Sequence, residues 1–217
     1  MISKYEICRM NILVVAATEF ELGSFDRQNN SEDVLITGIG IPATIFHLTK
    51  KLYQKNYDLV IQAGIAGAFG DTLKTGSVVM VEKDTYGDIG IDEKENFKTL
   101  FETGLASENN FPFKNGWLLN QHEYFTHPTL PAVKGITVNK ITDDATQIKN
   151  LAEKFRADIE SMEGAAFHYV CLQQKVKFLQ LRSISNIVGE RDKEKWNIQE
   201  AILNLNIELK KIIQNFI

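Results

Sequence analysis

Residues 158–167 read DIESMEGAAF, which places two carboxylates, Glu160 and Glu163, directly before a run of small and apolar residues. Every position from 165 to 172 except His168 is apolar or aromatic, and this pattern predicts a buried helix. Carboxylates are rarely buried without a partner, although they also favour helix N-termini. A carboxylate at the start of this helix is therefore either a helix-start charge or a group that binds a ligand.

The composition is typical of a soluble globular protein of one domain. Of the 217 residues, 44% are hydrophobic and 24% are charged, with a formal net charge of −4. No basic stripe indicates a nucleic-acid partner, and no apolar run approaches the ~18 residues of a membrane span. Cys8 and Cys171 lie far apart, which suits a reducing compartment and predicts neither a disulfide framework nor a zinc site. We expect a cytoplasmic protein.

The apolar, β-branched run at residues 11–17 (NILVVAA) is typical of a strand covered on both faces. Glu19 and Glu21 follow directly at its carboxyl end. Ligands of open α/β sheets bind beyond the carboxyl ends of strands, so either carboxylate is a candidate functional group. A solvated loop carboxylate is the alternative at this point.

Two glycine-rich segments follow predicted strands. The strand at residues 33–37 runs into Gly38-Ile39-Gly40, which we interpret as a tight strand-to-helix turn. A dinucleotide site would need an acidic residue that this segment lacks. The strand at residues 58–62 opens into residues 63–70 (AGIAGAFG), where glycines let the backbone pass close to a ligand.

The remaining segments continue an alternation of strands and helices, which predicts a single α/β domain. Further strands are expected at residues 77–81, 133–138 and 176–184, and helices after residues 142–144, over 165–172 and over 198–216. In the irregular middle, His122 and His127 are five residues apart and precede a proline, so we reject them as a metal site. We expect no metal and no cofactor.

Four separated segments resemble, in order, those of the nucleoside phosphorylase/nucleosidase superfamily: residues 10–21, 63–67, 161–166 and 182–186. The resemblance implies a three-layer α/β/α domain with a central mixed, twisted sheet over residues 10–217. Residues 1–9 are then a tail, with Met10 as an alternative start. It also implies a nucleoside substrate and a homodimer or homotetramer.

Within the superfamily the chain most resembles the futalosine hydrolases, the nucleosidases of the alternative menaquinone pathway. Residues 161–166 and 185–192, together with Trp196, carry this likeness. The implied reaction is hydrolysis of the N-ribosidic bond of futalosine, which releases hypoxanthine and dehypoxanthine futalosine. The alternatives are a nucleosidase for methylthioadenosine or S-adenosylhomocysteine, a purine nucleoside phosphorylase and a non-catalytic purine-binding protein.

The resemblance also implies roles for individual residues. Glu21 matches the carboxylate that activates water, and Glu163 matches the one that binds the ribose hydroxyls, with Met162 against the sugar. Asn186 matches the residue that contacts the leaving purine. Further substrate-binding candidates lie beside these positions: Thr18, Gly64, Ile65, Ala66, Ser161 and Arg191. Ser161 and Ile65 depart from the residues common in methylthioadenosine nucleosidases, and at Ile65 the water or hydroxyl contacts of the family's serine do not carry over. We expect Glu160 to be structural.

The residue at position 186 bears on the choice of base. Hypoxanthine presents two acceptors, O6 and N7, whereas adenine presents a donor and an acceptor on the same edge. The amide of Asn186 offers hydrogen-bond donors to the two acceptors of hypoxanthine. A mispaired buried polar group costs about 1–3 kcal/mol, which favours hypoxanthine over adenine. The alternative is that Asn186 is a turn residue.

The charged residues of the chain help to choose between a hydrolase and a phosphorylase, and they suggest a partner for the 5′ group of the substrate. Glu19 and Glu21 would repel the phosphate that a phosphorylase binds, which favours a hydrolase. Arg191 is a candidate partner for the benzoate of futalosine, although an internal pair with Asp192 or Glu190 is favoured. His122 or His127 could also contribute, across a subunit boundary.

Overall fold

The strand β1 (Ile12–Ala16) shows how the sequence builds the centre of the fold. All five side chains are buried, and they alternate between two hydrophobic clusters. Ile12 and Val14 belong to one cluster, and Leu13 and Val15 belong to the other. The prediction that this strand is covered on both faces is confirmed.

The computed structural model describes residues 10–23, 25, 32–93, 96–120, 130–190, 192, 194 and 196–216. Its helices are η1 (Phe20–Leu22), α1 (Ile41–Gln54), α2 (Ala145–Phe155), α3 (Gly164–Gln173) and α4 (Ile198–Gln214). The other strands of the main sheet are β2 (Asp33–Ile36), β3 (Leu59–Ala68), β4 (Val78–Tyr86), β7 (Leu118–Leu119), β8 (Ala132–Thr137), β9 (Ile159–Ser161) and β10 (Phe178–Ile187). A separate hairpin consists of β5 (Gly90–Glu93) and β6 (Asn96–Thr99).

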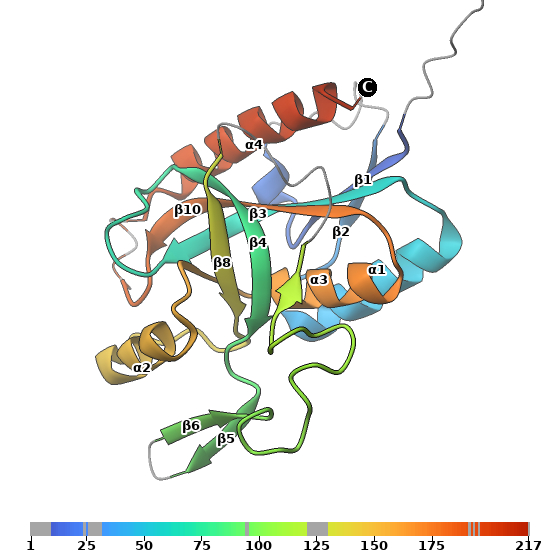
Figure 1. The fold of residues 1–217 in the computed structure, drawn as a ribbon. Helices are drawn as coiled ribbons and strands as arrows, with labels where there is room; N and C mark the ends of the chain where they lie inside the picture. Colours follow the sequence, from blue (N-terminus) through green and yellow to red (C-terminus); the bar gives the residue numbers. More distant parts are fainter. Residues whose placement is uncertain are drawn as a thin grey trace, which may run out of the picture.

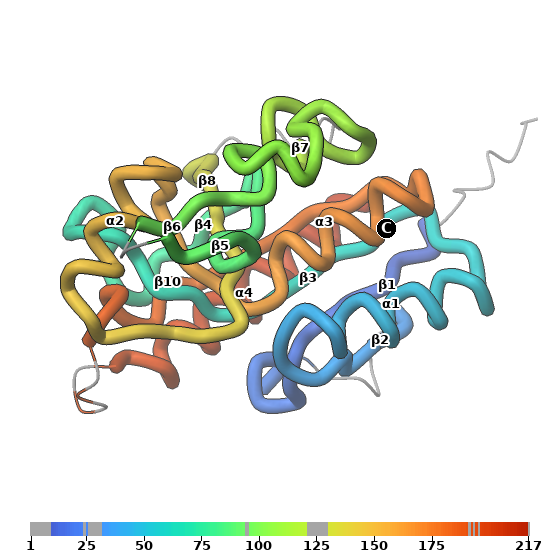
Figure 2. The backbone as a smooth tube through the Cα atoms, turned by 90° about the horizontal axis from the view of Figure 1, so that it is seen from below, coloured from blue at the N-terminus to red at the C-terminus, as the bar shows by residue number. Residues whose placement is uncertain are grey.

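The sheet lies between α4 on one face and α1 with α3 on the other (Figure 1). Leu205 and Leu209 of α4 pack in the first cluster, whereas Leu48 of α1 and Phe167 of α3 pack in the second. Figure 2 shows α1 and α3 side by side over their face. The predicted three-layer α/β/α architecture is confirmed. In the described part of the chain, no helix is long and apolar enough to cross a membrane.

The sheet is mixed, and part of it closes on itself. β3 pairs in parallel with β1 and β10, and its last two residues pair with β9 in antiparallel register. β9 continues to β8, β8 to β4, and β4 returns to β10. Five strands therefore form a ring, which brings the ends of β3, β9 and β10 together.

Three local predictions differ from the structure. The strand predicted to end at residue 62 continues, as β3, through the glycine-rich segment to Ala68. Likewise, β10 extends through Asn186 to Ile187, beyond its predicted end. Residues 159–161, which we assigned to the approach to a helix, form β9. In each case the extra residues gain backbone hydrogen bonds from strands distant in sequence, which a local pattern does not reveal. The predicted tail, residues 1–9, lies outside the described residues.

Candidate active site

A pocket of about 340 Å³ opens at the carboxyl ends of β1, β3 and β10. This is the edge at which ligands bind in α/β sheets. Eight of the predicted site residues line it: Thr18, Glu21, Ile65, Ala66, Ser161, Met162, Glu163 and Asn186. Segments separated by more than 160 residues in sequence thus contribute to one cavity.

Two predicted site residues do not belong to this lining. Gly64 lies beneath the site, where a Cβ would come 2.2 Å from Nη1 of Arg182 and 2.9 Å from Oε1 of Glu21. Gly64 leaves the space that the Arg182 guanidinium occupies, and its contact with substrate stays a prediction. Arg191 lies outside the described residues, as do His122 and His127.

The carboxylate of Glu21 is held in a fixed orientation by its neighbours. Its Oε2 accepts hydrogen bonds from the backbone amide of Thr18 at 3.0 Å and from the Thr18 hydroxyl at 3.3 Å. Its Oε1 accepts one from the backbone amide of Ile65 at 3.2 Å. A carboxylate has about four acceptor positions, so one on Oε1 is left for a water molecule. Glu21 is 7% exposed.

Glu163 precedes the first residue of α3 and is buried in the wall of the pocket. Its Oε1 accepts a hydrogen bond from the backbone amide of Gly40 at 3.0 Å, and its Oε2 lies 3.7 Å from Nη1 of Arg182. Burial raises the pKa of Glu163, while Arg182 and the Gly40 amide oppose that rise. The turn before α1, predicted from its glycines, thus contributes directly to the site.

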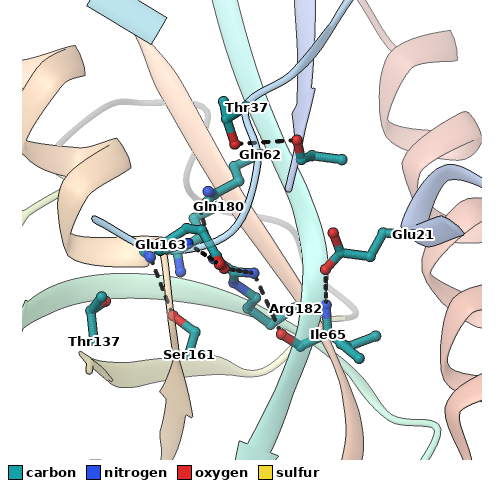
Figure 3. A network of polar contacts seen from close by, with 12 residues as sticks. Glu21, Thr37, Gln62, Ile65, Thr137, Ser161, Glu163, Gln180 and Arg182 are labelled. Carbon is teal, nitrogen blue, oxygen red and sulfur yellow. Dashed lines mark hydrogen bonds and ion pairs between the residues drawn. The ribbon is translucent and has the colours of Figure 1, made fainter. Parts of the chain in front are cut away.

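Arg182 of β10 lies at the centre of this polar network (Figure 3). Its guanidinium is 1% exposed, donates to Oε1 of Gln62 at 2.9 Å and to the carbonyl oxygen of Ile65 at 3.4 Å, and faces Glu163. Arg182 lies in one of the segments that carry the family resemblance, residues 182–186, but the sequence alone predicted no role for it. A signal was present, because an arginine within an apolar strand needs buried partners.

A second buried carboxylate, Asp84, supports the start of α3 from behind. The Thr137 hydroxyl donates to Oδ1 of Asp84 at 2.9 Å and accepts from the backbone amide of Ala165 at 2.7 Å. A Cβ on Gly164 would lie 2.1 Å from Oδ2 of Asp84, so only glycine fits there. Asp84 and Thr137 therefore fix the position of the helix that Glu163 precedes.

Asn186 lines the pocket, but its amide is partly engaged. Nδ2 donates to the carbonyl oxygen of Ile187 at 2.9 Å, and Oδ1 accepts from the Ser185 hydroxyl at 2.7 Å. One N–H of the amide is left for a ligand, rather than the two donors that sequence reasoning assumed. Ser161 is also engaged, because its hydroxyl accepts from the backbone amide of Gly164 at 3.2 Å.

Sequence reasoning missed most of the apolar rim. Phe20, Ile39 and Ile141 line the pocket and are more than one third exposed. Trp196, which was noted only for the resemblance, also lines it and donates from Nε1 to the carbonyl oxygen of Glu190 at 2.8 Å. Exposed apolar side chains are individually ordinary, and only their gathering at the mouth of a pocket indicates a binding surface.

Comparison with known proteins identifies the family. The profile of the phosphorylase superfamily matches residues 15–217. The futalosine hydrolase of Thermus thermophilus is 29% identical over 184 residues, which cover 82% of this chain and 80% of that protein. The 5′-methylthioadenosine/S-adenosylhomocysteine nucleosidase of Tolumonas auensis is 30% identical over 198 residues, which cover 87% of this chain and 81% of that protein.

Solved structures agree on the fold. The 5′-methylthioadenosine/S-adenosylhomocysteine nucleosidase of Colwellia psychrerythraea, in complex with adenine, superposes with a TM-score of 0.78 at 19% identity. The match covers 96% of each chain. The chain belongs to the phosphorylase superfamily, and its relatives place it among the nucleosidases, the hydrolases of N-ribosidic bonds.

Proposed function

We propose that this chain hydrolyses the N-ribosidic bond of futalosine and releases hypoxanthine. The observation that carries the choice of base is the amide of Asn186 in the pocket wall. Its remaining N–H can donate to O6 or N7 of a 6-oxopurine. The similar futalosine hydrolases support the same substrate.

The proposed mechanism divides the work between two carboxylates. Glu21 takes a proton from the attacking water at the free position of Oε1, because Thr18 and Ile65 fix its other acceptor positions. Glu163, when ionised, accepts hydrogen bonds from the ribose hydroxyls, and these are strengthened by its charge. Arg182 opposes the rise in the pKa of Glu163 that burial causes, and so favours its ionised form. Asn186 donates to the purine as negative charge develops on it.

The charges of the pocket favour water over phosphate as the nucleophile. Among the described residues that line it there are four glutamates, Glu21, Glu160, Glu163 and Glu190, and no lysine or arginine. Arg182, the buried cation close by in the described part of the chain, already faces Glu163. Among the described residues a phosphate anion would therefore gain no free cationic partner, which disfavours a phosphorylase.

The apolar rim is suited to the aromatic 5′ group of futalosine. Phe20, Ile39, Ile141 and Trp196 offer apolar and aromatic surface at the mouth of the pocket. Burial of such a group contributes roughly 25 cal/mol per Å² of apolar surface. The second candidate, a methylthioadenosine or S-adenosylhomocysteine nucleosidase, is favoured by the 30% identical relative.

One assay separates the candidates. Purified protein is incubated with futalosine, inosine and methylthioadenosine in phosphate-free buffer, and base release is followed. We expect hypoxanthine from futalosine as the fastest reaction. Faster release of adenine from methylthioadenosine would refute the proposal, a strict need for phosphate would indicate a phosphorylase, and no release would indicate a binding protein. The homodimer or homotetramer that the resemblance implies stays a prediction, to be measured by light scattering.

A further inference from the structure

Glu160 of β9 is a pocket carboxylate that the proposed mechanism does not use. It lines the pocket, is 7% exposed, and its Oε2 has no hydrogen-bond partner among the described residues. Burial, with a smaller contribution from Asp88, raises its pKa from 4.5 to about 7. A buried polar atom without a partner is unfavourable unless a ligand supplies one.

The sheet register places Glu160 opposite Asn186. Gly67 of β3 pairs with Asn186 on one side and with Glu160 on the other. Residues directly opposite each other on neighbouring strands project from the same face of a sheet, and both side chains line the pocket. Strand spacing puts the two backbones about 9–10 Å apart.

The residue between them, Gly67, has no side chain to fill this space. A Cβ there would lie 3.0 Å from Cγ2 of Val188 and 3.4 Å from Nδ2 of Asn186. Glycine therefore leaves a slot whose floor is the backbone of β3, with an amide on one wall and a carboxyl on the other. A planar base can lie over Gly67 between these two groups.

The chemistry of a 6-oxopurine matches these two walls. Hypoxanthine carries acceptors at N7 and O6 on one edge, and across the ring it carries an N–H donor at N1, where adenine has only a lone pair. If Asn186 donates to the N7 and O6 edge, then the N1 side faces Glu160. Of the groups on that side, only N1–H donates a hydrogen bond to a carboxylate.

We propose that Glu160 accepts the N1–H of the 6-oxopurine base and is, with Asn186, the second residue that determines base specificity. This assignment rests on the proposed hypoxanthine nucleoside as substrate. It replaces the structural role that sequence reasoning expected for Glu160, because a structural carboxylate would have partners in the protein. The hydrogen bond is charge-assisted where Glu160 is ionised, above about pH 7, so at such pH we expect its loss to weaken binding about 10- to 100-fold.

The test compares hypoxanthine with 1-methylhypoxanthine, which differs from it only at N1, and with adenine, which differs at N1 and at position 6. Hypoxanthine, 1-methylhypoxanthine and adenine are titrated calorimetrically into the wild-type protein and into Glu160→Met and Glu160→Gln. Methionine has a similar length and no acceptor of comparable strength, and glutamine keeps a neutral acceptor. Glu153→Gln, which makes the same change on the exposed face of α2, is the matched control. Thermal unfolding of each variant reports whether it folds.

We expect the wild type and Glu153→Gln to prefer hypoxanthine over 1-methylhypoxanthine by tenfold or more. Glu160→Met should lose that preference by binding hypoxanthine more weakly, with 1-methylhypoxanthine little changed, and Glu160→Gln should retain part of it. An unchanged preference in Glu160→Met, or an equal loss for both bases, would overturn the assignment. A wild type that prefers adenine to hypoxanthine would instead refute the proposed substrate, so the two failures are distinguishable.

Discussion

Glu163 and Arg182 face each other inside the protein, with 3.7 Å between Oε2 of the carboxylate and Nη1 of the guanidinium. Both side chains are buried, so each charge would be strongly unfavourable without the other. At 3.7 Å the pair is loose, and Oε2 can still accept a hydrogen bond from a ligand. The arrangement favours the charged form of Glu163 and leaves Oε2 available, which is what binding of ribose hydroxyls requires.

This pairing predicts the acid side of the pH profile. Burial raises the pKa of Glu163 above its ordinary 4.5, and the protonated form is a poorer acceptor for ribose. We therefore expect kcat/KM to fall with decreasing pH at a midpoint above 4.5. The positive charge of Arg182 lowers the pKa of Glu163. The Arg182→Gln variant lacks this charge, so the midpoint of its pH profile should lie at higher pH than that of the wild type. Lys154→Gln, a surface change, is the control; a midpoint at or below 4.5 would contradict the proposed role.

Replacement of Glu21 by glutamine should abolish turnover. The amide cannot take a proton from water, and general-base catalysis typically contributes 10²- to 10⁴-fold. We expect kcat to fall by at least about 100-fold, with hypoxanthine affinity largely retained. Glu19→Gln, a change at an exposed neighbour, should keep full activity. Turnover by Glu21→Gln at the wild-type rate would remove Glu21 from the mechanism.

Gly64→Ala tests the space beneath the site. The new Cβ would overlap the Arg182 guanidinium, so the arginine must move away from Glu163 and Gln62. We expect kcat/KM for futalosine to fall by about tenfold or more, from the loss of an interaction of about 1.5–3 kcal/mol. Steady-state kinetics measure this. Gly67→Ala is the comparison. Its new Cβ would lie 3.0 Å from its nearest neighbour, Cγ2 of Val188, and the substitution should mainly raise KM.

Asn186→Asp tests the choice of base. A protonated aspartate can donate to N7 from its O–H and accept from a 6-amino group at its other oxygen, so the ratio of adenine to hypoxanthine nucleoside turnover should rise by about tenfold. Total activity should fall, because the substituted oxygen would face the Ile187 carbonyl at the place where Nδ2 now donates. Competition between futalosine and methylthioadenosine measures the ratio. An unaltered ratio would refute the amide argument.

Asp84 is expected to be protonated in the folded protein below about pH 7. Burial raises its pKa from 3.8 to about 7. His168 is neutral, because burial lowers its pKa to about 4, and its Nδ1–H is directed at the Leu118 carbonyl oxygen, 3.0 Å away. Nε2 of His168 and Oε1 of Gln180 then lack partners. In the structure Nε2 of Gln180 donates to Oδ2 of Asp84 at 3.3 Å. If the Gln180 amide were turned end for end, a protonated Asp84 would donate to Oε1 of Gln180, and the Gln180 amide nitrogen would face His168.

The protonated state makes stability depend on pH. Between about 3.8 and 7 the folded state binds more protons at Asp84 than the unfolded state, so stability falls as pH rises through this window. Asp84→Asn mimics the neutral acid and should lack this loss, which is on the order of 4 kcal/mol. Denaturant unfolding at several pH values measures it, with exposed Asp92→Asn as the control. Parallel pH curves for the wild type and Asp84→Asn would contradict the assignment.

Much of this protein could be predicted from local sequence. The unbroken apolar run of β1 required burial on both faces, and a carboxylate beside such a run had to lie at a sheet edge or a helix start. Glu21 and Glu163 were identified on that basis together with the family motifs, because each lies directly beside the predicted strand or helix that positions it.

Tertiary structure alone decided how these parts meet. The pairing of Gly67 with Glu160 joins residues 93 positions apart, and that of Gly67 with Asn186 spans 119 positions. Such pairings depend on how the ring of strands closes, which no local pattern encodes. For the same reason the sequence left Arg182 without a role and Glu160 as a structural residue. Only the closed sheet puts the arginine beside Glu163 and the second carboxylate across from Asn186.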